Sequence, residues 1–311
     1  MNAQFPIFQF KNPDATLPLE LWTVPHPPEQ LFIQGKPESL RLLKHLPDRG
    51  LAIVGTRNPQ PRSQALLKTK LLELTRSELI IISGMARGID SVAHHSALQA
   101  GLSTIAILGT GLDLAYPQET LGIRTEILKK GGLIITEFPP QTLGFQSNFL
   151  RRNRIIAGWS KATWVVEASF RSGALNTARW AREQNRDCFA VPGFPGDPAL
   201  AGNQILLDQD HAHSFWGVHS LGVSWLDLAA HTPLKDPKRT APTKRSSDSE
   251  ILAGHVKKLT LTRGGTSIHH LLDWALSHPW DPERFFIALQ ENLKTGSIQD
   301  ISGTFVSTES S

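Results

Sequence analysis

The sequence predicts an α/β fold built on a doubly wound, mainly parallel sheet. Short apolar runs recur about every 25 to 30 residues, and segments of 10–15 residues with helical leucine spacing separate them. Several of the runs end in a turn that contains glycine. Strands that alternate with helices of this length imply right-handed crossovers and parallel pairing. The predicted strands begin at Leu51, Leu79, Thr104, Leu133, Thr163 and Cys188.

Residues 1–37 form an N-terminal segment of different character. It contains seven prolines, which exclude a long helix. Leu31 to Gly35 resembles a short strand that ends in a turn, and we expect the rest to be an extended strap on the main domain.

The main domain is predicted over residues 38–230. Apart from the strands, it holds five helical segments with an amphipathic pattern. Asp90 lies in the first turn of the second of these, where a carboxylate favours the helix dipole. The predicted helices cover 63–76, 90–100, 118–130, 149–158 and 174–184.

Residues 231–250 are predicted to be a linker, because this stretch is rich in proline and charge and poor in apolar residues. Two helices at 267–276 and 281–293 and two β-prone pieces around Ser302 then predict a small winged-helix-like module over 251–311. The second helix has few basic residues, which favours protein contact or packing over reading of a DNA groove.

Net charge +4 and pI 9.3 indicate an anionic partner. The basic residues concentrate between Gln146 and Asn185, a stretch that contains seven arginines or lysines and only two glutamates. A solvated basic face is the alternative explanation.

The single cysteine, Cys188, excludes an internal disulfide and a zinc site with several cysteines, and its apolar neighbours predict burial. No apolar run reaches the ~18 residues of a membrane-spanning helix. We therefore expect a cytoplasmic protein without a membrane partner.

The glycine turns predict a phosphate-binding edge of the sheet. Gly55-Thr56-Arg57 offers amides, a hydroxyl and a guanidinium directly after a strand, and Ser83 to Gly88 with Arg87 suits an oxyanion nest. Plain strand-to-helix turns are the alternative. Together with the glycines after the third strand and after the fifth, the candidate residues are Gly55, Thr56, Arg57, Ser83, Gly84, Arg87, Gly88, Gly109, Gly111, Ser172 and Gly173.

A second cluster, Phe149 followed by Arg151, Arg152, Asn153 and Arg154, begins a helix. Phe149 could stack on an unpaired base while Arg152 and Arg154 face phosphates, a combination that suits single-stranded nucleic acid. The alternatives are a core phenylalanine with surface arginines, and an Asn153 that holds the local backbone.

Catalytic chemistry finds little support in the sequence. No P-loop or dinucleotide fingerprint is present, and no serine elbow surrounds Ser83 or Ser172. His94 and His95 diverge on a helix, and His211, His213 and His219 lack carboxylates at ligand spacing. We expect no enzyme activity, no metal and no cofactor.

These motifs, in this order, resemble DNA-processing protein A, also called Smf. The similarity runs from about Pro18 to about His213 and includes Ser83 to Asp90, Leu108 to Asp113, Tyr116-Pro117, Glu137 to Pro140, Phe149 to Gly158 and Ala190 to Gly193.

The resemblance implies an extended Rossmann-like domain that binds single-stranded DNA without hydrolysing nucleotide. It also implies a homodimer that helps to load the RecA recombinase during natural transformation. Thr56, Arg57, Gly84, Phe149, Arg152 and Arg154 would line the strand pocket.

Three features depart from the pattern of the family. Gln146 stands where many relatives carry lysine, the last loop reads Gln209-Asp210-His211-Ala212, and the chain begins just upstream of the strap. The helical N-terminal domain of some members is therefore expected to be absent.

The alternative is a small-nucleotide sensor or a phosphoribohydrolase-like enzyme of a related fold. The stretch from Val166 to Gly173 lacks the paired glycines and trailing glutamate that such chemistry needs.

Overall fold

The computed structural model describes residues 5–75, 77–114, 116–193, 196–215, 217, 248–263, 265–267, 270, 271, 274, 282–301 and 304–308. The chain divides into two compact units, residues 1–231 and 232–311. No helix among the described residues is both long enough and apolar enough to cross a membrane.

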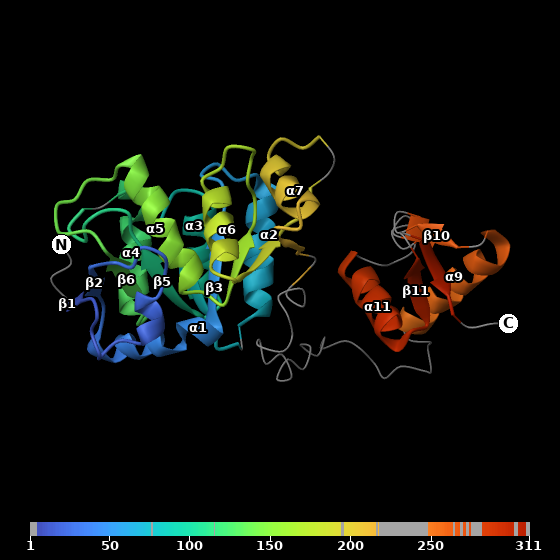
Figure 1. Ribbon diagram of the computed structural model, residues 1–311, viewed down its shortest axis with the longest axis horizontal. Coiled ribbons are helices and arrows are strands. Elements are labelled where there is room, and N and C mark those ends of the chain that lie inside the picture. Colours follow the sequence, from blue (N-terminus) through green and yellow to red (C-terminus); the bar gives the residue numbers. More distant parts are fainter. Residues whose placement is uncertain are drawn as a thin grey trace. The chain divides into compact units, whose positions relative to one another are not determined.

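The first unit is built on a mixed nine-stranded sheet in the order β1-β2-β6-β5-β4-β3-β7-β8-β9 (Figure 1). The predicted strands are present, and those from β3 to β9 are parallel. The strands are β1 (Ile7–Lys11), β2 (Gln30–Gln34), β3 (Gly50–Val54), β4 (Ile80–Ser83), β5 (Ser103–Ile107), β6 (Leu133–Thr136), β7 (Ala162–Val165), β8 (Asp187–Ala190) and β9 (His213–Ser214).

The N-terminal segment contributes to this sheet rather than only lying on it. β2 pairs antiparallel with β6, and β1 pairs antiparallel with β2. Leu31 and Ile33 of β2 are fully buried, so the alternating side chains of this strand complete the core.

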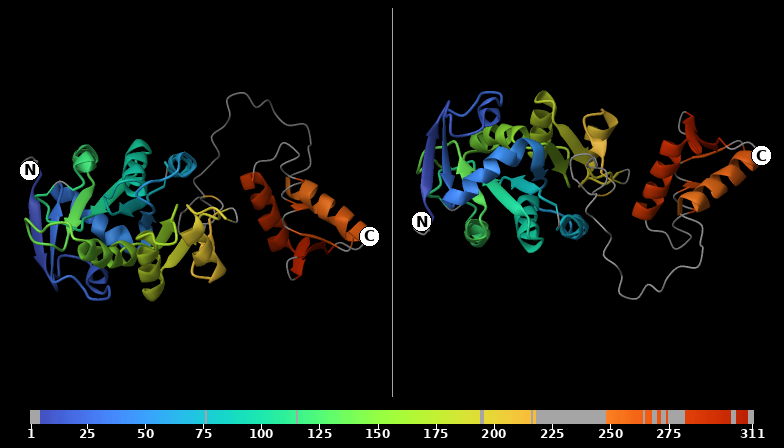
Figure 2. Two further views of the ribbon diagram at one scale, coloured as in Figure 1. Left: turned by 90° about the horizontal axis from the view of Figure 1, so that it is seen from above. Right: turned by 90° about the horizontal axis from the view of Figure 1, so that it is seen from below.

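Helices cover both faces of the sheet (Figures 1 and 2). The apolar sides of α5 and α6 pack on one face, and those of α2 and α3 pack on the other, where α4 also lies against β5 and β6. The α-helices are α1 (Leu46–Arg49), α2 (Pro61–Glu73), α3 (Ile89–Gln99), α4 (Leu121–Lys129), α5 (Gln146–Gly158), α6 (Ala174–Glu183) and α7 (Ala201–Asp208), with 3-10 turns at Leu19–Trp22, Pro37–His45 and Gln118–Thr120.

The strand order reverses direction next to β3. From β3 the chain passes to β4 on one side, whereas β7 lies on the other side of β3 and continues to β8. Loops that leave the carboxyl ends of β3 and β7 therefore separate, and such a switch point is where open α/β sheets bind ligands. The helix α5 carries the chain from β6 to β7 across this point.

The second unit contains α9 (Asp248–Arg263), β10 (Thr266–Ser267), α11 (Pro282–Thr295), β11 (Ile298–Ile301) and β12 (Thr304–Ser307). Its strands form a sheet in the order β10-β12-β11. The predicted helix at 281–293 and the two strands are present. The element order is consistent with a winged helix, and that assignment stays a prediction.

Two predictions for this part of the chain need correction. Residues 248–250 belong to α9 and not to a linker, and Ser267 lies in β10 and not in a helix. Leu252, Val256 and Leu259 at helical spacing carry the signal for α9, and the first two are fully buried. The remainder of the predicted linker, 231–247, lies outside the described residues.

Candidate nucleic-acid interface

A cleft of about 590 Å³ opens at the switch point, at the carboxyl edge of the parallel strands. It is lined by the turns after β3 and β4, by Tyr116 from the loop after β5, by the loop after β6 with α5, and by the loop after β7 with the start of α6. Segments that follow five strands thus meet at one edge of the sheet. Eight of the predicted residues are in its lining: Gly55, Thr56, Arg57, Phe149, Arg152, Asn153, Ser172 and Gly173.

The turn after β3 is fixed by hydrogen bonds. The Thr56 amide donates to the Glu167 carbonyl (2.7 Å), and the Ile89 amide donates to the Thr56 carbonyl (3.1 Å). The Glu167 carboxylate accepts from the Gln60 amide (3.0 Å), one residue before α2. The exposed Arg57 side chain is therefore presented from a rigid backbone.

Phe149 forms the aromatic part of the cleft. The Arg57 guanidinium carbon lies 5.7 Å from the centre of its ring, a cation–π distance. A Cβ atom added at Gly109 or Gly144 would come within 2.5 or 2.8 Å of the ring, so only glycine fits at these positions. Gly109 therefore acts as packing for Phe149 and does not line the cleft.

Arg152 is buried and forms the floor of the cleft. Its Nη1 donates to the Gly84 carbonyl (2.7 Å) and to the Ile107 carbonyl, and its Nε donates to Asn153 Oδ1 (3.2 Å). Burial is the main cause that lowers the pKa of Arg152 to about 10; the Asp90 carboxylate opposes this effect and the Arg57 charge adds to it. The guanidinium is still charged at neutral pH.

Asp90, a cleft residue, changes the interpretation of the turn after β4. Its Oδ2 accepts from the amides of Gly84 (3.2 Å) and Ala86 (3.3 Å). Burial raises the pKa of Asp90, and Arg152 and these hydrogen bonds oppose the shift. The predicted oxyanion nest at 83–88 thus already holds a carboxylate of the same chain, so these two amides are not available to a phosphate.

Other members of that turn also lie outside the cleft lining. Ser83 is fully buried, and its hydroxyl donates to the Ile53 carbonyl (2.6 Å). Arg87 forms an exposed ion pair with Glu119. Gly88 has φ +79°, and a Cβ there would lie 2.3 Å from the Thr56 carbonyl oxygen, so this glycine lets the turns after β3 and β4 pack together.

Gly111, another predicted residue, lies in the loop after β5. Its amide donates to the Thr142 carbonyl (3.0 Å), which joins the loops after β5 and β6.

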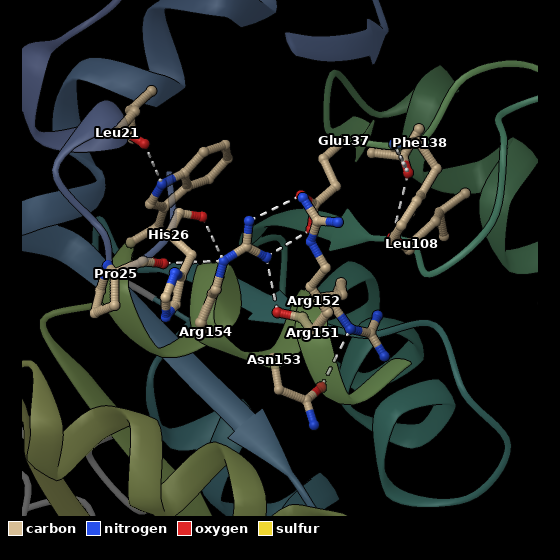
Figure 3. A network of polar contacts seen from close by, with 12 residues as sticks. Leu21, Pro25, His26, Leu108, Glu137, Phe138, Arg151, Arg152, Asn153 and Arg154 are labelled. Carbon is tan, nitrogen blue, oxygen red and sulfur yellow. Dashed lines mark hydrogen bonds and ion pairs between the residues drawn. The ribbon is translucent and has the colours of Figure 1, made fainter. Parts of the chain in front are cut away.

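Arg154 does not face the cleft, contrary to the prediction that it would face phosphates. Its side chain is 1% exposed and forms a bidentate ion pair with Glu137 (2.6 and 2.8 Å). Its Nε donates to the carbonyls of Pro25 (3.0 Å) and His26 (2.9 Å) (Figure 3). Arg154 therefore fixes α5 to the N-terminal segment.

Arg152 and Asn153 point away from Glu137, whereas Arg151, like Arg154, points toward it (Figure 3). Arg151 is half exposed and pairs with Glu137 (3.1 Å) outside the cleft lining. Asn153 donates to Asn176 Oδ1 (3.2 Å) on α6, which supports the idea that it holds local structure. Arg151 and Arg154 thus share Glu137, whereas Arg152 and Asn153 line the cleft, because successive helical side chains diverge by ~100°.

The ends of two helices complete the site. The first turns of α5 and α6 line the cleft through Gln146 and Gly173-Ala174, and their positive dipole ends favour an anion there. No side chain caps the amides of α5. Gln146 is exposed in the lining.

Residues that the sequence did not single out for binding also line the cleft, notably Tyr116, Asp90 and Thr177. The predicted histidine loop lies elsewhere: His213 is in β9, His211 contacts Arg182, and His219 is outside the described residues. Within the described residues there is no group of three or more side chains that could hold a metal ion.

Comparison with known proteins agrees with this geometry. Residues 10–222 match the family of DNA recombination-mediator protein A. The chain belongs to this family.

Curated relatives support the assignment to DNA recombination-mediator protein A. Protein Smf of Synechocystis is 42% identical over 188 residues, 60% of this chain and 46% of that protein. DNA processing protein DprA of Streptococcus pneumoniae is 36% identical over 206 residues, 66% of this chain and 70% of that protein. The match to the first curated relatives spans about half of their length.

Two solved structures share the fold. The X-ray structure of DprA from S. pneumoniae superposes with a TM-score of 0.63 at 34% identity and covers 72% of this chain and 75% of that one. A structure concerned with the single-stranded DNA binding mode of DNA processing protein A from Helicobacter pylori gives 0.61 at 27%, with 71% and 96% covered. The predicted extended Rossmann-like fold is confirmed.

Proposed function

We propose that this chain binds single-stranded DNA in the cleft at the switch point, without hydrolysing nucleotide, and acts as a mediator of recombination. The observation that carries the proposal is the convergence of Arg57, Arg152, Phe149 and two helix N-termini on one cleft. Guanidinium groups and helix ends attract phosphates, and an aromatic ring accepts an unpaired base. Family membership supports the same role, with RecA as partner, a homodimer as the acting form and the cytoplasm as its place.

The acidic residues near the cleft support a binding role over hydrolysis. Asp90 accepts two backbone amides, Glu137 is held by Arg154, and the Glu167 carboxylate accepts the Gln60 amide. All three are less than 10% exposed. A phosphoribohydrolase needs a carboxylate directed at the sugar, and none of these three is available for that purpose.

The test compares oligo-dT with a duplex of equal length across a series of salt concentrations. Contact with ~3–5 phosphates gives a slope of log K against log salt of roughly −2 to −3.5, at about −0.7 per phosphate of a single strand. Arg57→Ala should flatten the slope by about 0.7.

Arg49→Ala is the matched control. Arg49 is a half-exposed arginine immediately before β3, at the opposite edge of the sheet from the exposed Arg57. Its removal should leave the slope unchanged. Equal effects of the two substitutions, or tighter binding to the duplex than to oligo-dT, would reject the assignment of the cleft.

A further inference from the structure

The tyrosine in the cleft adds to the site that the sequence predicts. Tyr116 stacks on Phe149, with ring centres 5.5 Å apart and planes inclined by 26°. The sequence suggests Phe149 as a ring that could stack on a base, and in the structure this ring packs against Gly109, Gly144, Arg57 and Tyr116. Tyr116 and Phe149 together form an aromatic wall of the cleft, and a base that approaches this wall meets two rings.

The exposure of the two rings shows which one is presented to a ligand. Tyr116 is 49% exposed, whereas Phe149 is half-buried in its packing against the two glycines. No described residue forms a hydrogen bond with the Tyr116 hydroxyl, so packing on Phe149 is what orients the ring. A large aromatic surface is thus left open to solvent inside a cleft that also holds Arg57 and Arg152.

We propose that Tyr116 is a base-stacking residue of the cleft, and that a nucleobase of the bound single strand lies against its exposed face. Phe149 supports the tyrosine ring, and Arg57 contacts Phe149. Aromatic stacking accepts any base, so the contact adds affinity without sequence preference. This inference rests on the proposed function of the cleft.

The charges around the pair favour a nucleotide over an apolar partner. The Arg57 guanidinium contacts the supporting ring, and Arg152 lies at the floor of the same cleft. A phosphate held by these groups would bring its own base within reach of the wall. An apolar peptide would have to desolvate the Arg57 charge and return no partner for it.

The experiment uses the fact that Tyr116 is the single tyrosine among 311 residues. The protein is produced with 3-fluorotyrosine, so its ¹⁹F spectrum contains one resonance, which Tyr116→Phe removes and thereby assigns. The full chain is titrated with oligo-dT and with an abasic oligonucleotide of equal length, which keeps the phosphates and lacks the bases. Oligo-dT should shift the resonance, and the abasic strand should bind through phosphates and shift it much less.

Affinities separate stacking from a structural role of the ring. Tyr116→Leu should weaken oligo-dT binding by roughly 5-fold or more and change abasic binding by less than about 2-fold. Tyr116→Phe, which keeps the ring, should retain the affinity for oligo-dT.

The outcomes distinguish the two proposals. Oligo-dT binding with an unmoved resonance, or an equal loss for both strands in Tyr116→Leu, would overturn the role of Tyr116 and leave the function of the cleft intact. Absence of oligo-dT binding by the unsubstituted protein would reject both.

Discussion

Arg154 and Arg152 are two residues apart on α5 and have different surroundings. Arg152 lies at the floor of the cleft, whereas Arg154 is buried against Glu137 and two carbonyls of the N-terminal segment. A buried charge that loses its partner is costly, so Arg154 contributes to this site through the stability of α5.

Substitution of Arg154 tests this assignment. Arg154→Met should lower the free energy of unfolding by about 3–5 kcal/mol, because Glu137 then keeps only the half-exposed Arg151 as an ionic partner. Urea denaturation measures the loss. The salt slope of DNA binding should stay at its original value under conditions where the variant is folded. A flatter slope would mean that Arg154 contacts phosphate after all.

His94 makes stability depend on pH. Its Nδ1 lies 2.7 Å from Thr104 Oγ1, whose proton is donated to the Ile81 carbonyl, so Nδ1 carries the imidazole hydrogen. Nε2 is buried and has no partner among the described residues. Burial, with a smaller effect of the Arg152 charge, lowers the pKa of His94 to about 3.

The sign of the pH effect follows from this shift. The unfolded chain binds a proton at His94 below about pH 6.5 and the folded chain does so only near pH 3, so acid favours unfolding. This residue should reduce the free energy of unfolding by up to about 1.4 kcal/mol per pH unit within that window. Urea titrations at pH 4–7 should show a shallower pH dependence in His94→Asn.

His95→Asn removes an exposed histidine from the same helix and is the matched control. If both variants changed the pH dependence equally, burial of His94 would not be its cause.

At the scale of elements, the turns after β3 and β4 form one packed unit. Gly88 permits this, because its φ of +79° and the nearby Thr56 carbonyl leave no space for a side chain. Gly88→Ala should cost more than the about 1–3 kcal/mol of a strained backbone alone, and it should weaken DNA binding by displacing the Thr56-Arg57 turn. Chemical denaturation and oligo-dT titration measure the two effects.

Gly101→Ala separates strain from crowding. Gly101 follows the same helix, α3, and has φ +72°, but a Cβ atom added there would have no other atom within 4 Å. Its substitution should cost only the backbone strain and leave DNA affinity unchanged. Equal losses of stability in the two variants would mean that backbone strain, and not contact between the turns, determines the cost of Gly88→Ala.

The strands and most helices of the first unit could be predicted because buried parallel strands are continuous apolar runs. Leu51 to Val54 and Leu79 to Ile82 indicate β3 and β4 directly. The sequence pattern does not predict α7 and β9, since β9 is only two residues long and has no apolar pattern of its own. It also misses α9 as a whole, because the prolines and charges before this helix dominate the composition of that region.

The candidate site could be predicted in position more readily than in detail. Glycine turns mark the carboxyl ends of the strands, and parallel pairing brings these ends together at one edge of the sheet. The sequence does not say which amides are already occupied, so it does not predict the hydrogen bonds of the Asp90 carboxylate with Gly84 and Ala86. Tyr116 comes from a loop 33 residues before Phe149, and only the fold brings the two rings together.

At the scale of the whole molecule, each unit has an apolar core of its own. The clusters of the first unit draw on residues between Phe5 and Phe215, and that of the second on residues between Leu252 and Phe305. All residues that line the cleft belong to the first unit.

A chain truncated after residue 231 should therefore unfold cooperatively and bind oligo-dT with the salt slope of the full chain. Differential scanning calorimetry and the same salt titration check the two statements. If the slope of log K against log salt became shallower by about 0.7 or more, which corresponds to one phosphate contact, the second unit would be shown to contact the strand.

The four consecutive polar residues of α5 make that helix intolerant of length changes. An insertion of one residue ahead of Arg151 would rotate every later side chain by about 100°. The cation at the cleft floor would leave its carbonyls, and the guanidinium that binds Glu137 and the Pro25-His26 carbonyls would turn away from them. Substitutions can therefore alter this helix one function at a time, whereas an insertion or deletion along it removes ligand affinity and fold together.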